Sequence, residues 1–170
     1  MKIVTALLAI LLFSGGTLYP EKPASFWKKV DKNLNRIFNG KIITKKDVEL
    51  NVKELTELKF KNNGIYLLVS DGETLGYVVF ASSMGRFESF DYMVVYNPDV
   101  TVKEINVLNY TSPHGGEVAS PRWLKQFIGY EGKHLKYGSD IEALTGATYS
   151  ATSLVRDVEA VTVFMKTIKH

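Results

Sequence analysis

The sequence predicts a single α+β domain in which an antiparallel sheet is packed with helices. Three observations support this prediction: an amphipathic helical pattern near the N-terminus, a central series of β-rich segments joined by short turns, and a second amphipathic helix at the C-terminus. The chain has 170 residues, of which 45% are hydrophobic and 23% charged, so it can bury one core.

The composition excludes several classes of protein. Lys and Arg total 21 against 18 for Asp and Glu, and a net charge of +3 is too weak to favour a nucleic-acid partner. The chain has no cysteine, which excludes disulfides, thiolate metal sites and cysteine nucleophiles. Its 3 scattered histidines leave little for a histidine metal site, so we expect no bound metal.

The N-terminal residues have the pattern of an export signal. Lys2 precedes an unbroken apolar run over residues 3–13, and Ser14 and Gly16 are small residues suited to a cleavage site. The run is shorter than the roughly 20 residues that span a bilayer. We predict a signal peptide over residues 1–16, a linker over 17–24 and a protein exported from the cytoplasm, with an uncleaved membrane anchor as the alternative.

A basic amphipathic helix is predicted next, with Ser25 as its cap and Asn39-Gly40 as its end. The residues of its apolar face are Phe26, Trp27, Val30, Leu34, Ile37 and Phe38. Those of its basic face are Lys28, Lys29, Lys32 and Arg36. We assign residues 25–64 to this helix and a connector. The basic face is either a solvated surface or a contact with an anionic membrane or an acidic partner.

Residues 65–170 form the main domain on this interpretation. Strands are predicted over residues 65–70, 75–81, 92–96 and 102–110, with turns at 71–72 and 97–99. A loop over 111–121 and a short helix over 122–128 follow. The last helix is expected to start near Ser150, with the buried stripe Leu154, Val158, Val161, Met165 and Ile168, and with Arg156, Asp157, Glu159 and Lys166 facing away.

The segment over residues 140–150 carries the strongest functional pattern, because small and hydroxyl residues gather where a helix begins. A helix N-terminus attracts phosphate through its unpaired amides and its dipole. Gly146 and Ala147 leave room for a phosphate ester, and Thr145, Thr148 and Ser150 supply hydroxyls, one of which could be esterified. The alternative is a plain turn and helix cap. Common hydrolase, nucleotide-binding and metalloprotease motifs are absent from the sequence.

Residues 142–148, which read Glu-Ala-Leu-Thr-Gly-Ala-Thr, resemble the motif D-x-x-[ST]-G-A-T of the FMN-binding domain family. That family includes the C subunit of the sodium-pumping NADH:quinone reductase and the G subunit of the Rnf complex. The resemblance implies that Thr148 carries FMN through a phosphoester bond, which a flavin transferase installs with FAD as donor. Glu142 stands where the family has Asp.

Weaker resemblances lie upstream and extend the similarity over about residues 65–165. Residues 82–87 and 90–96 resemble the family's glycine turn and the strand that precedes its flavin loop. Residues 109–117 resemble its loop H-x-E-T-P-G-x-G, with Thr111 where the family often has Glu. Residues 121–127 resemble the short helix of its secreted members.

A flavin ring needs an aromatic platform and nearby backbone amides. Candidate platform residues are Trp123, Phe87 and Tyr149, each with a core position as the alternative. The amides of Gly115 and Gly116 could approach the ring, or these residues could form a plain loop. His114 is a candidate proton donor or a surface residue. Arg86 and Glu117 are candidate contacts or members of surface ion pairs.

The first functional hypothesis is therefore an exported electron carrier with covalent FMN that exchanges electrons with a redox partner protein or a membrane electron-transport complex. It would be a redox subunit more than a stand-alone enzyme, and its basic helix could give it a peripheral contact with the membrane. The second hypothesis is a secreted binding module that holds a phosphate-bearing ligand without a covalent bond, or a partner protein, and has no redox activity.

Overall fold

The computed structural model describes residues 22–51, 53–54, 58 and 60–168, and the signal peptide predicted over residues 1–16 lies outside them. A 5-stranded sheet with the strand order β1-β2-β3-β4-β5 forms its centre. The strands are β1 (Thr44–Asp47), β2 (Lys61–Ser70), β3 (Glu73–Met84), β4 (Ser89–Tyr96) and β5 (Val102–Asn109). The helices are α1 (Ala24–Ile37), η1 (Gly116–Ala119), α3 (Pro121–Leu124), η2 (Lys125–Phe127) and α4 (Thr148–Thr167).

Every strand of the sheet is antiparallel to its neighbours. The turn between β2 and β3 places Asp71 at φ 50° and Gly72 at φ 82°, the left-handed pair that a two-residue hairpin requires. The predicted turn at 71–72 and the predicted antiparallel sheet are therefore confirmed. Each predicted strand lies wholly or mostly within an observed one, and β2, β3 and β4 are longer than the sequence pattern indicated.

Gly76 marks an irregularity in β3 where the strand passes very close to β4. Its φ is +135°, and a Cβ atom at this position would lie 1.9 Å from the backbone oxygen of Tyr96. Only glycine fits there, because a backbone oxygen that is fixed in the sheet cannot move aside for a Cβ atom. The close approach lies next to the register shift between Leu68 and Val69 on the β2 side.

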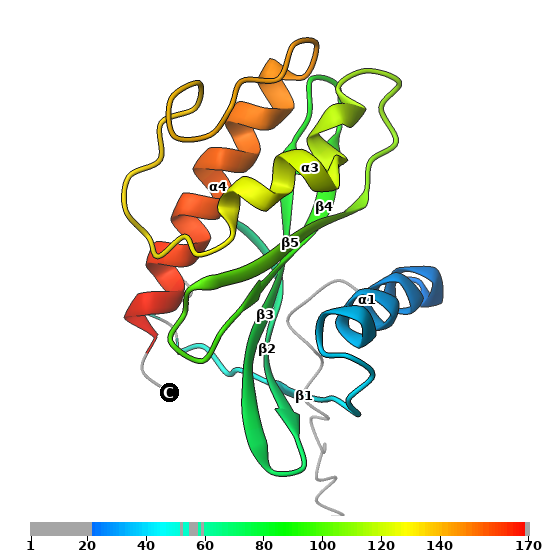
Figure 1. Ribbon diagram of the computed structural model, residues 1–170, viewed down its shortest axis with the longest axis vertical. Helices are drawn as coiled ribbons and strands as arrows, with labels where there is room; N and C mark the ends of the chain where they lie inside the picture. Colours follow the sequence, from blue (N-terminus) through cyan, green and yellow to red (C-terminus); the bar gives the residue numbers. More distant parts are fainter. Residues whose placement is uncertain (1–21, 52, 55–57, 59, 169–170) are drawn as a thin grey trace, which may run out of the picture.

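The sheet is the middle of three layers, with α1 against one face and α4 against the other (Figure 1). Alternate residues of β3 serve the two faces: Val78 and Phe80 pack in the cluster with α1, whereas Val79 and Ala81 pack in the cluster with α4. This alternation follows from the period of two along a strand. The prediction of one α+β domain is confirmed.

The N-terminal region differs from prediction in two details. Helix α1 begins after Pro23, whose carbonyl accepts a hydrogen bond from the amide of Phe26 at 2.9 Å, so the predicted cap at Ser25 is wrong. Strand β1 was not predicted, because its sequence Thr-Lys-Lys-Asp has no apolar alternation and its side chains are mostly exposed at the sheet edge. The predicted end of α1 at Asn39-Gly40 is confirmed, with both residues at positive φ.

The C-terminal helix α4 starts at Thr148, two positions before the predicted start. All residues of its predicted stripe are buried, as expected. Asp157 was predicted to face away from the core, and this is wrong, since only 7% of its surface is exposed. The reason is that α4 is buried on more than one side. Asp157 lies on the side that faces the end of β3, at Ser82 and Ser83, and the start of β4, at Ser89.

No helix among the described residues is long and apolar enough to cross a membrane.

Candidate functional site

A pocket of about 660 Å³ surrounds the start of α4. Three segments that are distant in sequence form it: the end of β3 with the turn after it, the loop after β5, and the first turns of α4. Its lining residues are Met84, Arg86, His114, Gly115, Gly146, Ala147, Thr148, Tyr149, Ser150, Thr152, Ser153 and Arg156. The sequence motif thus lies in a cavity of the size that small ligands and cofactors occupy.

The start of α4 has no side-chain cap. Ala147 is the N-cap residue, and the first turn contains no acidic residue. The first amide that returns to the helix is that of Ala151, which donates to the carbonyl of Ala147 at 2.9 Å. The amides of the first turn are left to other partners, and the positive end of the helix dipole faces the pocket. None of the hydroxyls that were considered as caps performs that role.

Thr148 is the first residue of the helix, and its side chain is exposed at the pocket. Its Oγ1 donates to the carbonyl of Leu144 at 3.4 Å, which is a long and weak hydrogen bond. The hydroxyl is therefore accessible. Gly146, two residues earlier, has φ +81°, and no atom lies within 4 Å of where its Cβ would be. The positive φ, and not a lack of space for a side chain, therefore favours glycine at position 146.

Ser150 has a different role from Thr148, because it is buried, with only 2% of its surface exposed. Its Oγ lies 3.0 Å from the hydroxyl of Tyr110, which in turn donates to the carbonyl of His114 at 2.6 Å. These bonds fasten the loop after β5 to the start of α4. A Cβ at Gly115 would lie 2.7 Å from the Tyr110 hydroxyl, so this fastening explains the glycine. The sequence analysis did not identify Tyr110.

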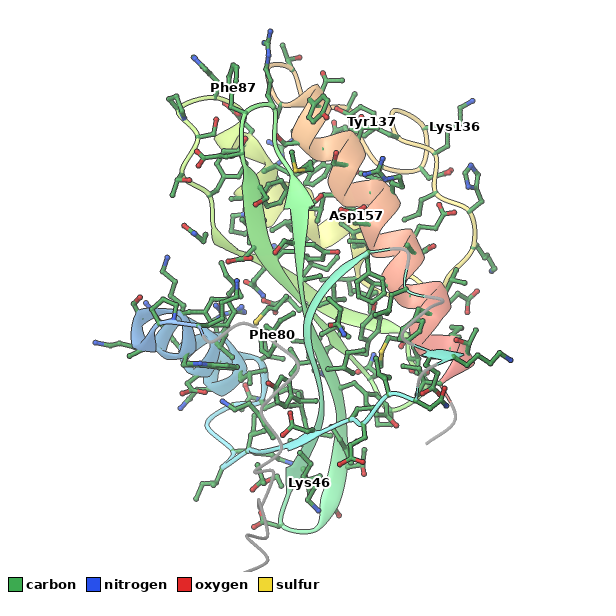
Figure 2. The ribbon with its side chains drawn as sticks, turned by 180° about the vertical axis from the view of Figure 1, so that it is seen from behind. Lys46, Phe80, Phe87, Lys136, Tyr137 and Asp157 are labelled. Atoms are coloured by element: carbon green, nitrogen blue, oxygen red, sulfur yellow. The ribbon has the colours of Figure 1, made fainter. Side chains whose placement is uncertain are left out.

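An apolar rim, formed by Met84, Tyr149 and Phe87, lies at the pocket: Met84 and Tyr149 line it, and Phe87 lies outside the lining, beside the lining residues Arg86 and His114. Phe87 is 67% exposed, Tyr149 56% and Met84 47%. The guanidinium of Arg86 lies 5.4 Å from the Phe87 ring centre, and the ring of His114 lies 6.4 Å from it. Phe87 lies at the end of the molecule where α4 begins (Figure 2). Aromatic, sulfur and cationic groups therefore surround the opening, an arrangement that suits a flat conjugated ligand.

Other predicted site residues lie outside the pocket lining. Thr145, Gly116 and Glu117 are exposed and do not border it. Trp123 is 3% exposed and belongs to the core cluster under the sheet face that α4 covers. Its Nε1 donates to the carbonyl of Glu142 at 2.7 Å, and the amide of Glu142 donates to Gln126 Oε1 at 2.8 Å. Trp123 thus supports the segment before Thr148 from below.

Several lining residues were not among the predicted site residues, namely Met84, Thr152, Ser153 and Arg156. A usable signal was present for two of them. Thr148, Thr152 and Arg156 are spaced four residues apart, which places them on one side of an α-helix. Among the described residues no group of His, Asp and Glu could hold a metal ion, and the pocket offers hydroxyls, amides and two arginines in place of metal ligands.

No family model matches the sequence, and no curated protein matches it. Solved structures with a similar fold include NqrC of Shewanella oneidensis, with 23% sequence identity, a TM-score of 0.47, and coverage of 72% of this chain and 68% of that one. They also include the C subunit of the Na⁺-translocating NADH-quinone reductase of Parabacteroides distasonis, with 16% identity, a TM-score of 0.49, and coverage of 88% of this chain and 100% of that one.

Proposed function

We propose that this protein is an electron-transfer flavoprotein that carries FMN through a phosphoester bond to Oγ1 of Thr148. The observation that supports this most directly is an accessible threonine hydroxyl at an uncapped helix N-terminus, beside a pocket of about 660 Å³. The first-turn amides and the helix dipole favour a phosphate group next to that hydroxyl. The resemblance of residues 142–148 to the FMN-binding domain family supports the same assignment.

The residues around the pocket fit FMN in chemical type. The start of α4 and the hydroxyls of Thr148 and Thr152 suit the phosphate, and the apolar rim suits the ring system. When bound, FMN supplies the redox chemistry. The protein contributes binding, orientation and partial exclusion of water. Tyr110 and Ser150 hold the two walls of the pocket together through their hydrogen bond.

Attachment is a group transfer from FAD. The Oγ1 of Thr148 forms a bond to the phosphorus of the FMN half, the bond between the two phosphates of FAD breaks, AMP leaves, and the hydroxyl proton passes to solvent through the transferase. Because the side chain of Glu142 is exposed and lies outside the pocket lining, we assign it to recognition by the flavin transferase. Glu142→Asp should be labelled at least as well as the parent, and Glu142→Ala less well.

The test is coexpression with a flavin transferase and a supply of FAD, followed by intact mass measurement. The parent should gain the mass of FMN less one water. Thr148→Ala should gain nothing and stay folded, with a loss of unfolding free energy of no more than about 1 kcal/mol, since no cap is removed. Thr145→Val is the matched control, because Thr145 belongs to the motif but not to the pocket lining, and it should keep the label.

Two results would contradict covalent attachment at Thr148. One is a full adduct on Thr148→Ala, and the other is an unlabelled parent while the same transferase labels a control substrate. The first result would place the phosphoester on another hydroxyl. The second would favour the second candidate function, a noncovalent binding module for a phosphate-bearing ligand. The uncapped helix start supports that candidate too, since it needs no reactive hydroxyl.

We further propose that the protein works outside the cytoplasmic membrane, with a redox partner protein or a membrane electron-transport complex. The N-terminal sequence of the mature protein should then begin close to Thr17.

Part of the basic face of α1 is used within the fold, since Lys29 donates to the carbonyl of Leu108 at 2.9 Å and Arg36 pairs with Glu104. Lys28 and Lys32 remain exposed and are the residues we assign to a peripheral membrane contact.

A further inference from the structure

Arg156 lies at the end of the pocket that is opposite the proposed attachment point. It follows Thr148 by eight residues, which corresponds to about 12 Å along an α-helix. Thr152 lies between them on the same side of α4, and all three residues line the pocket. The pocket therefore offers two positively charged regions on one helix: the amides of its first turn and the guanidinium of Arg156.

The guanidinium of Arg156 has one long hydrogen bond within the described part of the chain. Its Nε lies 3.4 Å from Oδ1 of Asp157, the next residue along the helix. The two terminal nitrogens have no hydrogen-bond partner within the described part of the chain, and the side chain is 72% exposed. Arginine has five N–H donors in a planar fork, so most of its donors face the pocket and the solvent.

Asp157, the neighbour of Arg156, occupies an unfavourable place for a carboxylate. It is 7% exposed, and burial raises its pKa. The Ser83 hydroxyl on β3 opposes this rise, although its geometry falls short of a hydrogen bond. On β4 the buried hydroxyl of Tyr92 has no partner among the described residues, and burial and the Asp157 charge raise its pKa. Arg156 also lowers the pKa of Asp157, through its positive charge and through the contact of its Nε with the carboxylate.

We propose that Arg156, positioned by Asp157, raises the reduction potential of the bound flavin by stabilising the negative charge of its reduced ring. This inference depends on the proposed attachment of FMN to Thr148. With the phosphate at the helix start, the first-turn amides already neutralise part of its charge, and a ring that lies against Met84 reaches Arg156, since these two residues line the pocket together. Reduction adds two electrons and one proton to the ring, which leaves one negative charge for a nearby cation to stabilise.

Asp157 allows a test that depends on the sign of the effect. If Asp157 acted only through its own negative charge, Asp157→Asn would remove a repulsion and raise the potential. If Asp157 positions Arg156, the same substitution releases the guanidinium from its place at the pocket and lowers the potential. Asparagine has nearly the same size as aspartate, so packing against Ser83 and Tyr92 changes little. The two roles therefore predict opposite shifts.

The experiment uses the full chain, labelled by coexpression with a flavin transferase, and starts with intact mass to show that each variant carries the adduct. The potential is then measured by titration with dithionite, which is oxidised to sulfite, against reference dyes. Arg156→Gln should reduce the ratio of reduced to oxidised flavin about tenfold at a fixed potential, a shift of about 30 mV for a two-electron couple. Arg156→Lys should keep more than half of the difference in potential between the parent and Arg156→Gln. Asp157→Asn should also shift the potential downward.

Lys166→Gln is the matched control, since it removes a cation from α4 outside the pocket and should leave the potential unchanged. A labelled Arg156→Gln protein with the parent potential would overturn the inference, as would a higher potential for Asp157→Asn. Loss of the adduct from Arg156→Gln alone would assign Arg156 to the phosphate and would overturn its placement at the ring. An unlabelled parent, beside a labelled control substrate, would instead overturn the proposed function on which the inference rests.

Discussion

The two faces of the sheet are covered in different ways. Helix α1 buries only Phe26, Val30 and Leu34, whereas α4 buries eleven residues of several chemical types, including Ser150, Asp157 and Thr162. Aromatic edge contacts dominate the α1 side, such as Phe26 against Phe80 with ring centres 5.6 Å apart. The α1 layer shields one face of the sheet, and the α4 layer shields the other face and also builds the pocket.

Polar contacts separate the two layers further. On the α1 side they are exposed or partly buried, as in the ion pair of Lys45 with Asp31 at 2.6 Å and the bond from Lys29 to the carbonyl of Leu108 at 2.9 Å. On the α4 side a buried bond of 2.9 Å joins the Tyr96 hydroxyl to Thr162 Oγ1. Apolar contacts tolerate small rotations of a helix, but a buried hydrogen bond does not. We infer that this bond helps to hold α4 in the rotation that keeps Thr148 and Arg156 at the pocket.

The largest expected effect comes from a matched pair of leucine truncations, one in each layer. Leu154→Ala in α4 should lower the unfolding free energy by about 3 to 4 kcal/mol, and Leu34→Ala in α1 by about 2 to 3 kcal/mol, because Leu34 belongs to a helix with few buried residues that can relax toward the sheet. Chemical denaturation measures both. Equal losses, with equal changes in hydrogen exchange around the pocket, would show that the layers do not differ as described.

Thr162→Val should cost about 1 to 3 kcal/mol, since it leaves the Tyr96 hydroxyl without a partner in a fully buried place. Combining Thr162→Val with Tyr96→Phe removes both partners, and the double variant should lose less than the sum of the single variants. A strictly additive result would mean that the bond does not couple α4 to the sheet, and the contrast between the layers would be weaker.

Asp157→Asn tests the one buried acid of the α4 layer through pH. Because burial raises the folded pKa of Asp157 above its ordinary value of 3.8, its favourable contribution is complete below that value and is lost as the pH rises through the raised pKa. The variant should therefore gain stability relative to the parent above that range. Unfolding curves from pH 3 to pH 8 measure it, and a constant difference would contradict the assignment.

The smallest effect is expected at the surface of the α1 layer. Arg36→Gln removes the ion pair with Glu104, where the arginine side chain is 57% exposed. We expect a loss below about 1 kcal/mol that shrinks as salt is added, because solvent-exposed pairs are screened. A larger, salt-independent loss would show that α1 depends on polar contacts as much as α4 does.

Much of the fold could be predicted because its core strands follow simple patterns. Val78 to Ala81 and Tyr92 to Val95 are apolar runs between clear turns, and the stripe of α4 has a regular helical period. Strand β1 could not be predicted, since its pairing with β2 depends on tertiary position and its residues are polar. Asp157 was misplaced for a related reason: periodicity identifies one buried stripe, while α4 is buried around more of its circumference.

The candidate site was predictable where one short segment supplies it. Residues 146–150 all line the pocket, and the resemblance of the motif drew attention to them. Residues that other segments contribute to the site were predicted less well. Arg86, His114 and Gly115 were identified, but Met84 and Tyr110 were not, and Trp123 was considered for the ring although it supports the chain beneath it. No local pattern encodes which of several aromatic residues reaches a shared cavity.

The uncapped start of α4 forms only when the protein has folded. Thr148 is displayed on a helix whose register depends on packing against the sheet, and a short peptide that contains residues 142–152 would hold little helix in water. If FMN is attached to Thr148 as proposed, a flavin transferase would act on the folded protein, after the strands have paired and the hydrogen bond between Tyr110 and Ser150 has formed. Under the proposed function, flavin attachment would depend on correct folding, since only the folded chain presents the Thr148 hydroxyl at a helix N-terminus.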